Sequence, residues 1–271
     1  MAGKIYIYCG VMLTILAASP AIAENSSVPA DYFENLPLVL TASRLKQSAA
    51  EAPSAVTVID HEMIVASGAR QIVDLLRLVP GFYVGYYRGS FPVAAYHGLS
   101  DAYARRMQVL VDGVSVYSPL YGGVEWAELP VFIQDIERIE VVRGSNAVSY
   151  GANAFLAVIN IITRDPATEP HVQAALNIGE SGIRDVVARV AQHGDDWRYR
   201  ISLGQRNDDR FTIIPDNSRI TLANLRAHYQ LNPVDELSFQ MRASRGMESA
   251  GFFEISNGDV GTPHPRDISQ S

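Results

Sequence analysis

Aromatic side chains and one arginine concentrate in and beside two segments of the chain, residues 85–92 and 118–128. Aromatic rings offer a surface on which a planar ligand can stack, and a guanidinium group can pair with an anion. These residue types therefore suit the binding of a small molecule, and the alternative is that the rings pack inside the protein. The side chains with this potential are those of Tyr86, Tyr87, Arg88, Phe91, Tyr117, Tyr121 and Trp126.

Recognisable catalytic and metal-binding motifs are absent from the sequence. His61-Glu62 lacks the second histidine four residues later that a zinc-binding helix requires, and the six histidines show no metal-ligand spacing. No phosphate loop of the Walker type and no nucleophile elbow occurs. We therefore expect no enzymatic activity, no bound metal and no cofactor.

The composition narrows the class of protein further. Of the 271 residues, 48% are hydrophobic and 19% are charged, which argues against a disordered chain. The net charge of −7 argues against a nucleic-acid-binding protein, because such proteins usually carry a basic face. The single cysteine excludes an internal disulfide framework and a cysteine-rich zinc site.

The first 23 residues have the features of a signal peptide. Lys4 provides a positive N-terminal region, residues 5–18 form a short apolar region, and Ala21-Ile22-Ala23 is a small-x-small cleavage site. The alternative is a buried N-terminal helix. No later segment reaches the roughly 20 apolar residues of a transmembrane helix, so an exported chain of this kind could enter a membrane only as a β-barrel.

Residues 44–167 are predicted to form a small α+β domain. A helix capped by Asp60 and a second helix over residues 69–78 are expected. Asp112-Gly113 lies between two short apolar runs and predicts a β-hairpin with a type I′ turn. Segments 85–92 and 118–128 are the two longest loops. The remaining strands are expected at residues 55–59, 82–84, 93–96, 136–143 and 157–163.

From residue 168 onward, apolar and polar side chains alternate with a period of two. Segments of about ten residues with one apolar and one polar face match the wall of a transmembrane β-barrel. A soluble antiparallel sheet with one solvated face is the alternative. About five strands are expected, too few to close a barrel, and the polar stretch 261–271 is expected to contain no strand. The five strands are predicted at residues 171–179, 183–193, 197–204, 223–231 and 237–244.

Several blocks of the first domain resemble, in order, the plug domain of TonB-dependent outer-membrane receptors. The blocks are PSAVTVIDHEMI, QIVDLLRLVPGFYV, RRMQVLVDGVSVYSPLYGG and DIERIEVVRGSNAVSYGANAFLAVINIITRDP. The last block, from Ile136 to Thr163, is the most specific, and the resemblance covers about residues 36–167. His97-Gly98 stands where the family usually has Arg-Gly, and Ser145 stands where it usually has proline.

The resemblance implies a plug folded inside a barrel of 22 strands, in the outer membrane of a Gram-negative bacterium. Such receptors bind a scarce ligand, such as a siderophore–iron chelate or cobalamin, and import it with energy delivered by the inner-membrane protein TonB. The apical loops of the plug would face the ligand, which would give the aromatic residues named above their role. The implied partners are TonB with its energising complex, the lipid of the outer membrane and a small-molecule ligand. A metal chelate is one class of such a ligand.

The resemblance also implies two further sets of functional residues. TonB would pair strand-on-strand with a short segment near the mature N-terminus. The candidate for this TonB box is Leu38, Val39, Leu40, Thr41 and Ala42, and the alternative is that this run is the first strand of the plug. The block that borders the barrel wall in the family contains Arg138, Glu140 and Arg143, which we expect to form plug–barrel contacts unless they are ordinary solvated charges.

We therefore expect the N-terminal part of a TonB-dependent receptor. The expected organisation is a signal peptide over 1–23, a leader with the candidate TonB box over 24–43, the plug over 44–167 and a truncated barrel over 168–271. The alternative is an exported periplasmic binding or interaction module without a pore. An exported enzyme is a third and weaker alternative.

Overall fold

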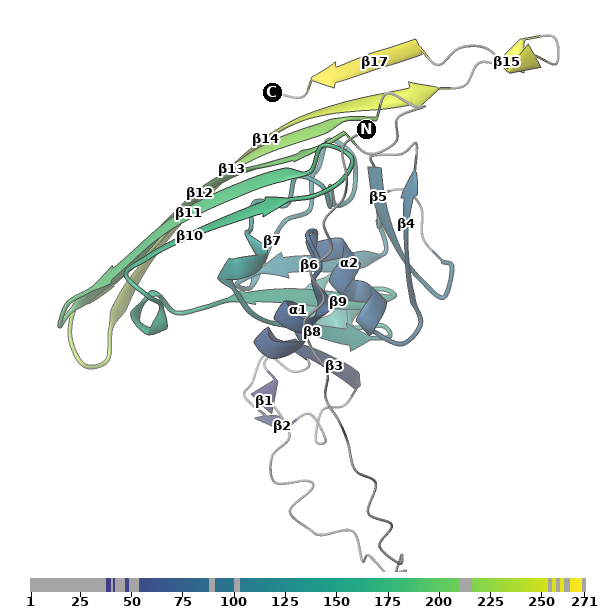
Figure 1. The fold of residues 1–271 in the computed structure, drawn as a ribbon. Coiled ribbons are helices and arrows are strands. Elements are labelled where there is room, and N and C mark those ends of the chain that lie inside the picture. Colours follow the sequence, from purple (N-terminus) through teal and green to yellow (C-terminus); the bar gives the residue numbers. More distant parts are fainter. Residues whose placement is uncertain are drawn as a thin grey trace, which may run out of the picture. The chain divides into compact units, whose positions relative to one another are not determined.

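The computed structural model describes residues 38–39, 41, 47–48, 54–87, 91–99, 103–209, 216–252, 255–256, 259–260 and 264–269. The predicted signal peptide lies outside these residues, as do Leu40, Ala42 and Arg88. Two sheets dominate the described part, one of five strands and one of six (Figure 1). Among the described residues, no helix combines the length and the apolar character needed to cross a membrane.

The five-stranded sheet is the centre of an α+β domain and has the strand order β3-β8-β9-β6-β7. β6 and β9 run parallel, and the other neighbours are antiparallel. β6 is buried along its whole length and β9 along most of it, as expected for strands covered on both faces. The strands are β3 (Ala55–Asp60), β6 (Met107–Val111), β7 (Val114–Ser115), β8 (Ile136–Arg143) and β9 (Ala157–Thr163).

Helices cover one face of this sheet. α1 (His61–Ser67) begins at the predicted cap, where the Asp60 carboxylate accepts a hydrogen bond from the Met63 backbone N–H at 2.8 Å. The second predicted helix is shorter than expected, because α2 (Ile72–Leu75) passes directly into the 3-10 helix η2 (Leu76–Leu78). The apolar residues of both helices pack on the sheet and form the main core with its central strands.

The domain contains two hairpins, one separate from the five-stranded sheet and one within it. β4 (Phe82–Tyr87) pairs with β5 (Phe91–Tyr96), so most of the predicted loop 85–92 belongs to strands, which is a correction. Aromatic residues favour strands, and Tyr86, Tyr87 and Phe91 lie in the parts of this segment that pair. The turn between β6 and β7 agrees with the prediction, because Asp112 and Gly113 have φ angles of 50° and 80°, as in a type I′ turn.

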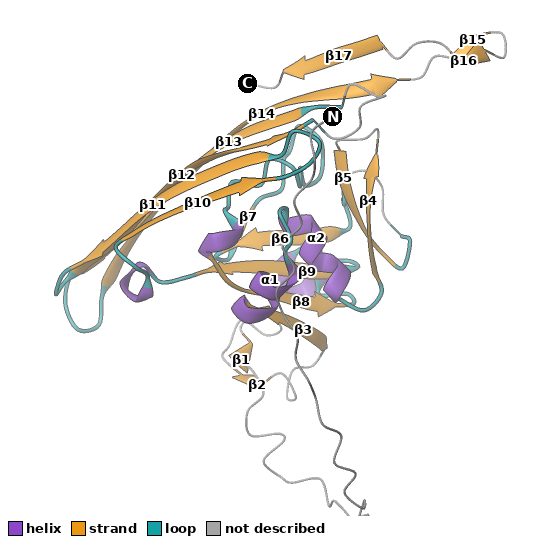
Figure 2. Cartoon of the chain, in the orientation of Figure 1, coloured by secondary structure: helices purple, strands orange, loops and turns teal. Residues whose placement is uncertain are grey.

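The second sheet, here called the wall sheet, is antiparallel throughout and follows the chain in strand order (Figure 2). The five predicted strands are confirmed. β10 and β11 are slightly shorter than predicted, whereas β12, β13 and β14 are longer. The expectation of no strand in 261–271 is wrong, because β17 pairs with the far end of β14. The edge of β14 offers unpaired backbone groups, and backbone pairing does not require apolar side chains. The strands are β10 (Val172–Ile178), β11 (Arg184–His193), β12 (Trp197–Asp208), β13 (Ser218–Gln230), β14 (Glu236–Phe252) and β17 (His264–Ser269).

Short elements connect or flank these sheets. The two-residue strands β1 and β2 pair with each other and are not part of the five-stranded sheet. The 3-10 helices η3 and η4 lie immediately before β8 and shortly after β9. The short elements are β1 (Leu38–Val39), β2 (Gln47–Ser48), η3 (Ile133–Asp135), α3 (Ala147–Tyr150), η4 (Pro166–Thr168), β15 (Ile255–Ser256) and β16 (Asp259–Val260).

Candidate ligand face and plug–wall contacts

The wall sheet exposes its apolar side chains and buries charged ones. In β10, Leu176 and Ile178 are 69% and 71% exposed, whereas Arg189 in β11 and Arg200 in β12 are each 3% exposed. A contiguous apolar surface of this kind marks contact with a membrane or a partner. The exposed apolar residues of the strands include Val172, Val186, Val190, Ile201, Leu203, Leu237, Phe239 and Met241.

Aromatic residues lie at one end of the exposed apolar face. The rings of Trp197 and Tyr199 stack with their centroids 5.6 Å apart, and Tyr229 is the register partner of Trp197 on β13. All three are close to the short connections at 194–196 and 231–235. Aromatic residues at the border of an apolar band are typical of the membrane–water interface of a β-barrel.

The opposite face of the wall sheet contacts the α+β domain through a buried charge cluster. Arg189 pairs with Asp135 at 2.7 Å and with Glu169 at 3.0 Å, and Arg200 pairs with Glu169 at 2.5 Å. Both carboxylates are buried. They come from η3 and from the residue after η4, so the α+β domain supplies the anions and the wall supplies the cations. Buried charges require such pairing, and here two cations face two anions.

A second contact is made by Arg70, in the connection between α1 and α2. Its guanidinium binds both carboxylate oxygens of Asp185 on β11, at 2.8 and 2.9 Å, and reaches Asp208 on β12 at 2.8 Å. Burial alone would lower the pKa of Arg70, but the hydrogen bonds and negative charges of the two aspartates raise it above its ordinary value. Arg70 is therefore held as a cation between two strands of the wall.

A third contact is made by Asp112 in the type I′ turn. Its carboxylate accepts a hydrogen bond from the Thr163 backbone N–H at 2.8 Å and pairs with Arg226 on β13 and with Arg242 on β14. The turn thus joins two strands of the domain to two strands of the wall. The sequence shows arginines repeated on the polar face of the wall strands. This pattern indicates charged contacts there, but it does not show which carboxylates of the domain pair with them.

The contacts with the barrel that we expect of Arg138, Glu140 and Arg143 stay a prediction, because the described wall strands are only part of a barrel. Glu140 binds Arg138 and Thr41 inside the plug. β8 is an interior strand between β3 and β9. The plug–wall ion pairs described above come from turns and from residues in or beside the 3-10 helices.

The candidate TonB box is divided by the structure. Leu38 and Val39 form β1, outside the five-stranded sheet. Thr41 is fully buried and forms hydrogen bonds with residues of the α+β domain. Leu40 and Ala42 lie outside the described residues.

Two of the predicted ligand-facing aromatics are joined by a residue that the sequence reasoning missed. Tyr103 stacks on Tyr121 with ring centroids 5.5 Å apart and meets the edge of Phe91 at 5.3 Å. The guanidinium carbon of Arg105 lies 5.8 Å from the centre of the Tyr103 ring. We call Phe91, Tyr103 and Tyr121 the aromatic platform. The Tyr-Ala-Arg sequence at 103–105 places a ring near a cation, and this pattern could have identified Tyr103 as a candidate ligand-binding residue.

The other candidates have different environments. Trp126 is 2% exposed and belongs to the main core, so its predicted place at the ligand is wrong. The nearby residues Val124 and Ala127 are also buried, so the large apolar ring of Trp126 packs in the interior with them. Tyr86 donates a hydrogen bond to Asp74 at 2.9 Å, Tyr87 is 49% exposed near the hairpin tip, and Tyr117 is partly buried. Arg88 lies outside the described residues.

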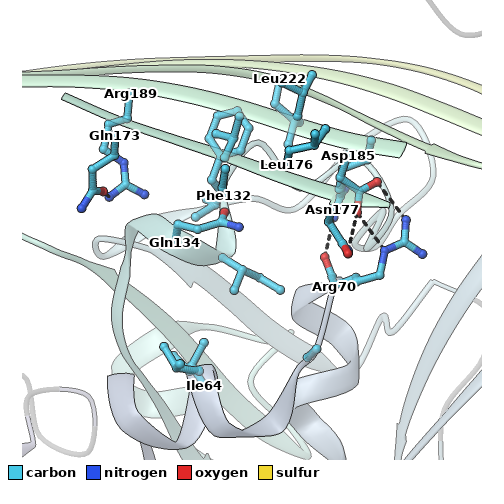
Figure 3. Close-up of a pocket in the computed structure, with 18 of the residues that line it drawn as sticks. Ile64, Arg70, Phe132, Gln134, Gln173, Leu176, Asn177, Asp185, Arg189 and Leu222 are labelled. Atoms are coloured by element: carbon cyan, nitrogen blue, oxygen red, sulfur yellow. Dashed lines mark hydrogen bonds and ion pairs between the residues drawn. The ribbon is translucent and has the colours of Figure 1, made fainter. Parts of the chain in front are cut away.

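A cavity of about 520 Å³ separates α1 from strands β10–β12 (Figure 3). Arg70 and Asp185 lie on one side of it, and Phe132 and Gln134 project toward the wall from the domain. Phe132 packs with Val187 and Leu222 and forms the apolar part of the contact. The domain and the wall are therefore joined by discrete contacts with open space between them. In the described ranges, no group of three or more His, Cys, Asp or Glu side chains has the arrangement of a metal site.

Comparison with known proteins relates both parts of the chain to one family. The family model for the TonB-dependent receptor plug domain matches residues 48–158. The vitamin B12 transporter BtuB of Photobacterium profundum is 29% identical over 201 residues, which are 74% of this chain and 32% of that protein. BtuB of Vibrio vulnificus is 32% identical over 148 residues, 55% of this chain and 24% of that protein. The chain thus spans about a third or less of the length of these curated relatives.

Solved structures share the fold. The ferripyoverdine receptor of the outer membrane of Pseudomonas aeruginosa aligns with a TM-score of 0.63 and 19% identity, over 87% of this chain and 31% of that one. The ferric-catecholate import receptor Fiu from E. coli K12 aligns with a TM-score of 0.61 and 20% identity, over 76% and 29%. The α+β domain thus matches the plug-domain model and is followed by strands of an antiparallel β-barrel, and the chain is similar to TonB-dependent receptors of the Gram-negative outer membrane.

Proposed function

We propose that this chain is part of a receptor that captures a scarce metal chelate at the outer membrane and imports it with energy from TonB. One observation carries the proposal: a plug domain is joined by buried charges to strands whose apolar side chains face away from it. This polarity supports a wall surrounded by lipid rather than a soluble module. The named relatives transport vitamin B12, and the structural neighbours include ferric-chelate receptors.

Capture of the ligand is assigned to the aromatic platform. Phe91, Tyr103 and Tyr121 come from three separate segments of the plug, and Arg105 adds a cation beside Tyr103. Stacked rings with an adjacent guanidinium suit a large, partly planar and anionic chelate, such as a ferric siderophore, or the corrin ring of a cobalamin.

Transport is tested with labelled ligands in living cells. Uptake of radiolabelled cobalamin and of iron-labelled siderophores is measured in the natural host, in a strain without this gene and in a strain without TonB. We expect uptake of one of these compounds to fall at least tenfold in both mutant strains. Unchanged uptake of every compound in the gene-deleted strain would contradict the proposal.

The aromatic platform is tested by binding to the purified receptor. We expect Tyr121→Ala to weaken binding of the transported compound about tenfold, because a stacking partner is lost, which corresponds to about 1.4 kcal/mol. Tyr83→Ala is the matched control, since Tyr83 is 69% exposed on the same hairpin as Phe91 but outside the platform. Equal affinities of the two variants would show that the aromatic platform does not contact the ligand.

Coupling to TonB is assigned to the segment that contains β1. Its ladder with β2 has only two residue pairs, so exchange for a TonB strand would break few hydrogen bonds. We expect Val39→Pro to abolish energised uptake and leave ligand binding intact, because proline removes a backbone N–H donor. Val39→Ala retains the donor and should transport normally. Normal uptake by the proline variant would place the TonB-binding segment elsewhere.

A further inference from the structure

Thr41 is bound to the plug by every polar group that it carries. Its backbone N–H and its hydroxyl both donate to Oε2 of Glu140, at 2.9 and 2.6 Å. Its carbonyl oxygen accepts a hydrogen bond from the Tyr150 hydroxyl at 2.8 Å, and its hydroxyl oxygen accepts one from the Asn160 side chain at 3.1 Å. Thr41 is fully buried and lies two residues after β1. The segment proposed to bind TonB is therefore tied to the plug immediately after its described strand.

Glu140 is an unusual partner for this contact. It lies in the middle of β8, beside Val58 on β3 and Asn160 on β9, and it is fully buried. A buried carboxylate destabilises a protein unless its oxygens are hydrogen-bonded or paired. Arg138 binds Oε1 at 2.9 Å, and Thr41 supplies two donors to Oε2. The N-terminal segment thus completes the coordination of a charge inside the plug sheet.

The same hydrogen bonds continue to the wall sheet. Asn160 donates to Thr41, and its side-chain oxygen accepts a hydrogen bond from the Gly113 backbone N–H at 3.3 Å. Gly113 follows Asp112, whose carboxylate pairs with Arg226 and Arg242 of the wall. A chain of direct hydrogen bonds, with one peptide link, therefore connects the N-terminal segment to two barrel strands.

We propose that Thr41, Glu140 and Asn160 form a clasp that couples the N-terminal segment to the Asp112 contact with the wall. Withdrawal of Thr41 removes two hydrogen bonds from Glu140 and one from Asn160. The Asn160 side chain can then turn away from Gly113, which loosens the turn that presents Asp112 to the wall. A pull on β1 would thus weaken a plug–wall contact before the plug core opens. This inference rests on the proposed function in that TonB is assigned the pull.

Amide hydrogen exchange in the purified full-length receptor tests the clasp without transport. In Glu140→Gln, the carboxylate that accepts from the Thr41 N–H is neutralised, so we expect exchange at Thr41 to accelerate at least tenfold. In Thr41→Val, the hydroxyl partner of Asn160 is lost, so we expect exchange at Gly113 to accelerate at least threefold. Exchange at Ile159, in the interior of the sheet, should stay unchanged in both variants.

The matched control is Glu137→Gln, on the same strand as Glu140 but with a side chain that is 50% exposed. This variant should leave the rate of hydrogen exchange unchanged at both the Thr41 and the Gly113 amide. Unchanged exchange at Thr41 in Glu140→Gln, or at Gly113 in Thr41→Val, would overturn the clasp even if uptake requires TonB. The expected exchange rates together with uptake independent of TonB would support the clasp as a tie between segment and wall, and would refute the proposed function.

Discussion

The plug and the wall sheet follow opposite rules for burying side chains. In the plug, Ile59, Ile139 and Ile159 are completely buried. In the wall, Leu176 is 69% exposed while Arg200 is 3% exposed. A sheet with this inverted polarity is stable only where its outer medium is apolar and its inner face meets polar partners. The plug provides those partners through Asp135, Glu169, Asp112 and Arg70.

The contact between the two regions also differs from the interior of either one. The plug core is buried and mostly aliphatic, whereas the contact with the wall consists of ion pairs, one small apolar cluster around Phe132 and a cavity of about 520 Å³. Parting an aliphatic core exposes apolar surface to water, but parted charges can be hydrated. The contact is therefore suited to release the plug from the wall while the plug core stays folded.

The largest expected effect follows from removing one carboxylate of the buried charge cluster. Asp135→Asn leaves two buried arginines with one anion, and we expect a loss of about 3–5 kcal/mol in the free energy of plug opening. Asp165→Asn is the control, because the Asp165 side chain is 42% exposed where it pairs with Arg198 on the wall, and it should cost about 1 kcal/mol or less. Hydrogen exchange of plug amides measures both. Equal losses of free energy in Asp135→Asn and Asp165→Asn would contradict the idea that the buried ion pairs stabilise the plug–wall contact more than the exposed pair does.

The next effect tests the outer face of the wall. Leu203 is 54% exposed on β12, and Leu203→Arg should destabilise the receptor in lipid vesicles by about 2–4 kcal/mol if the residue lies near the membrane centre. A solvated surface would tolerate this change within about 0.5 kcal/mol. Val234→Arg, in a connection where Val234 is 88% exposed, is the control. Urea titration of the receptor in lipid vesicles measures the free energy of unfolding of both variants.

A smaller effect is expected at Arg70, which is only partly buried. Arg70→Gln removes charged hydrogen bonds to Asp185 and Asp208, and we expect about 1–3 kcal/mol less protection of the α1 amides against exchange. Arg77→Gln affects a more exposed pair with Asp74 within the plug, and its cost should stay below about 1 kcal/mol. The reverse order would contradict the assignment of Arg70 as a plug–wall contact.

The smallest effect is a pH dependence at Glu128. Burial raises the pKa of Glu128 above its ordinary value of 4.5, so the folded protein favours the protonated form. The unfolded state releases this proton first, and stability therefore falls as the pH rises through 4.5 and up to the folded pKa. We expect Glu128→Gln to match the natural receptor near pH 4 and to exceed it in thermal stability at pH 7. A natural receptor equally or more stable at pH 7 would contradict this sign.

Local signals predicted the elements of the fold well. The Asp60 cap, the Asp112-Gly113 turn and the alternation of the wall strands each act within a few residues, and all three are found. The errors concern long-range packing. Trp126 enters the core and β17 forms on the edge of β14, because each outcome depends on neighbours that are distant in the sequence. The contact of Glu140 with Thr41 depends on such neighbours too, and the sequence did not predict it.

The central claim, a polar plug face against a wall whose other side meets lipid, is tested most directly by spin labels on adjacent wall positions. Single labels are placed at Ile201 and Leu203 and at Ser202 between them, with Phe239, Met241 and Gln240 as a second set, in receptor reconstituted in bilayers. We predict that labels at the four apolar positions collide with oxygen dissolved in the lipid and are protected from a water-soluble nickel complex, whereas labels at Ser202 and Gln240 lack the lipid exposure. High accessibility of the four apolar positions to the nickel complex would contradict the account.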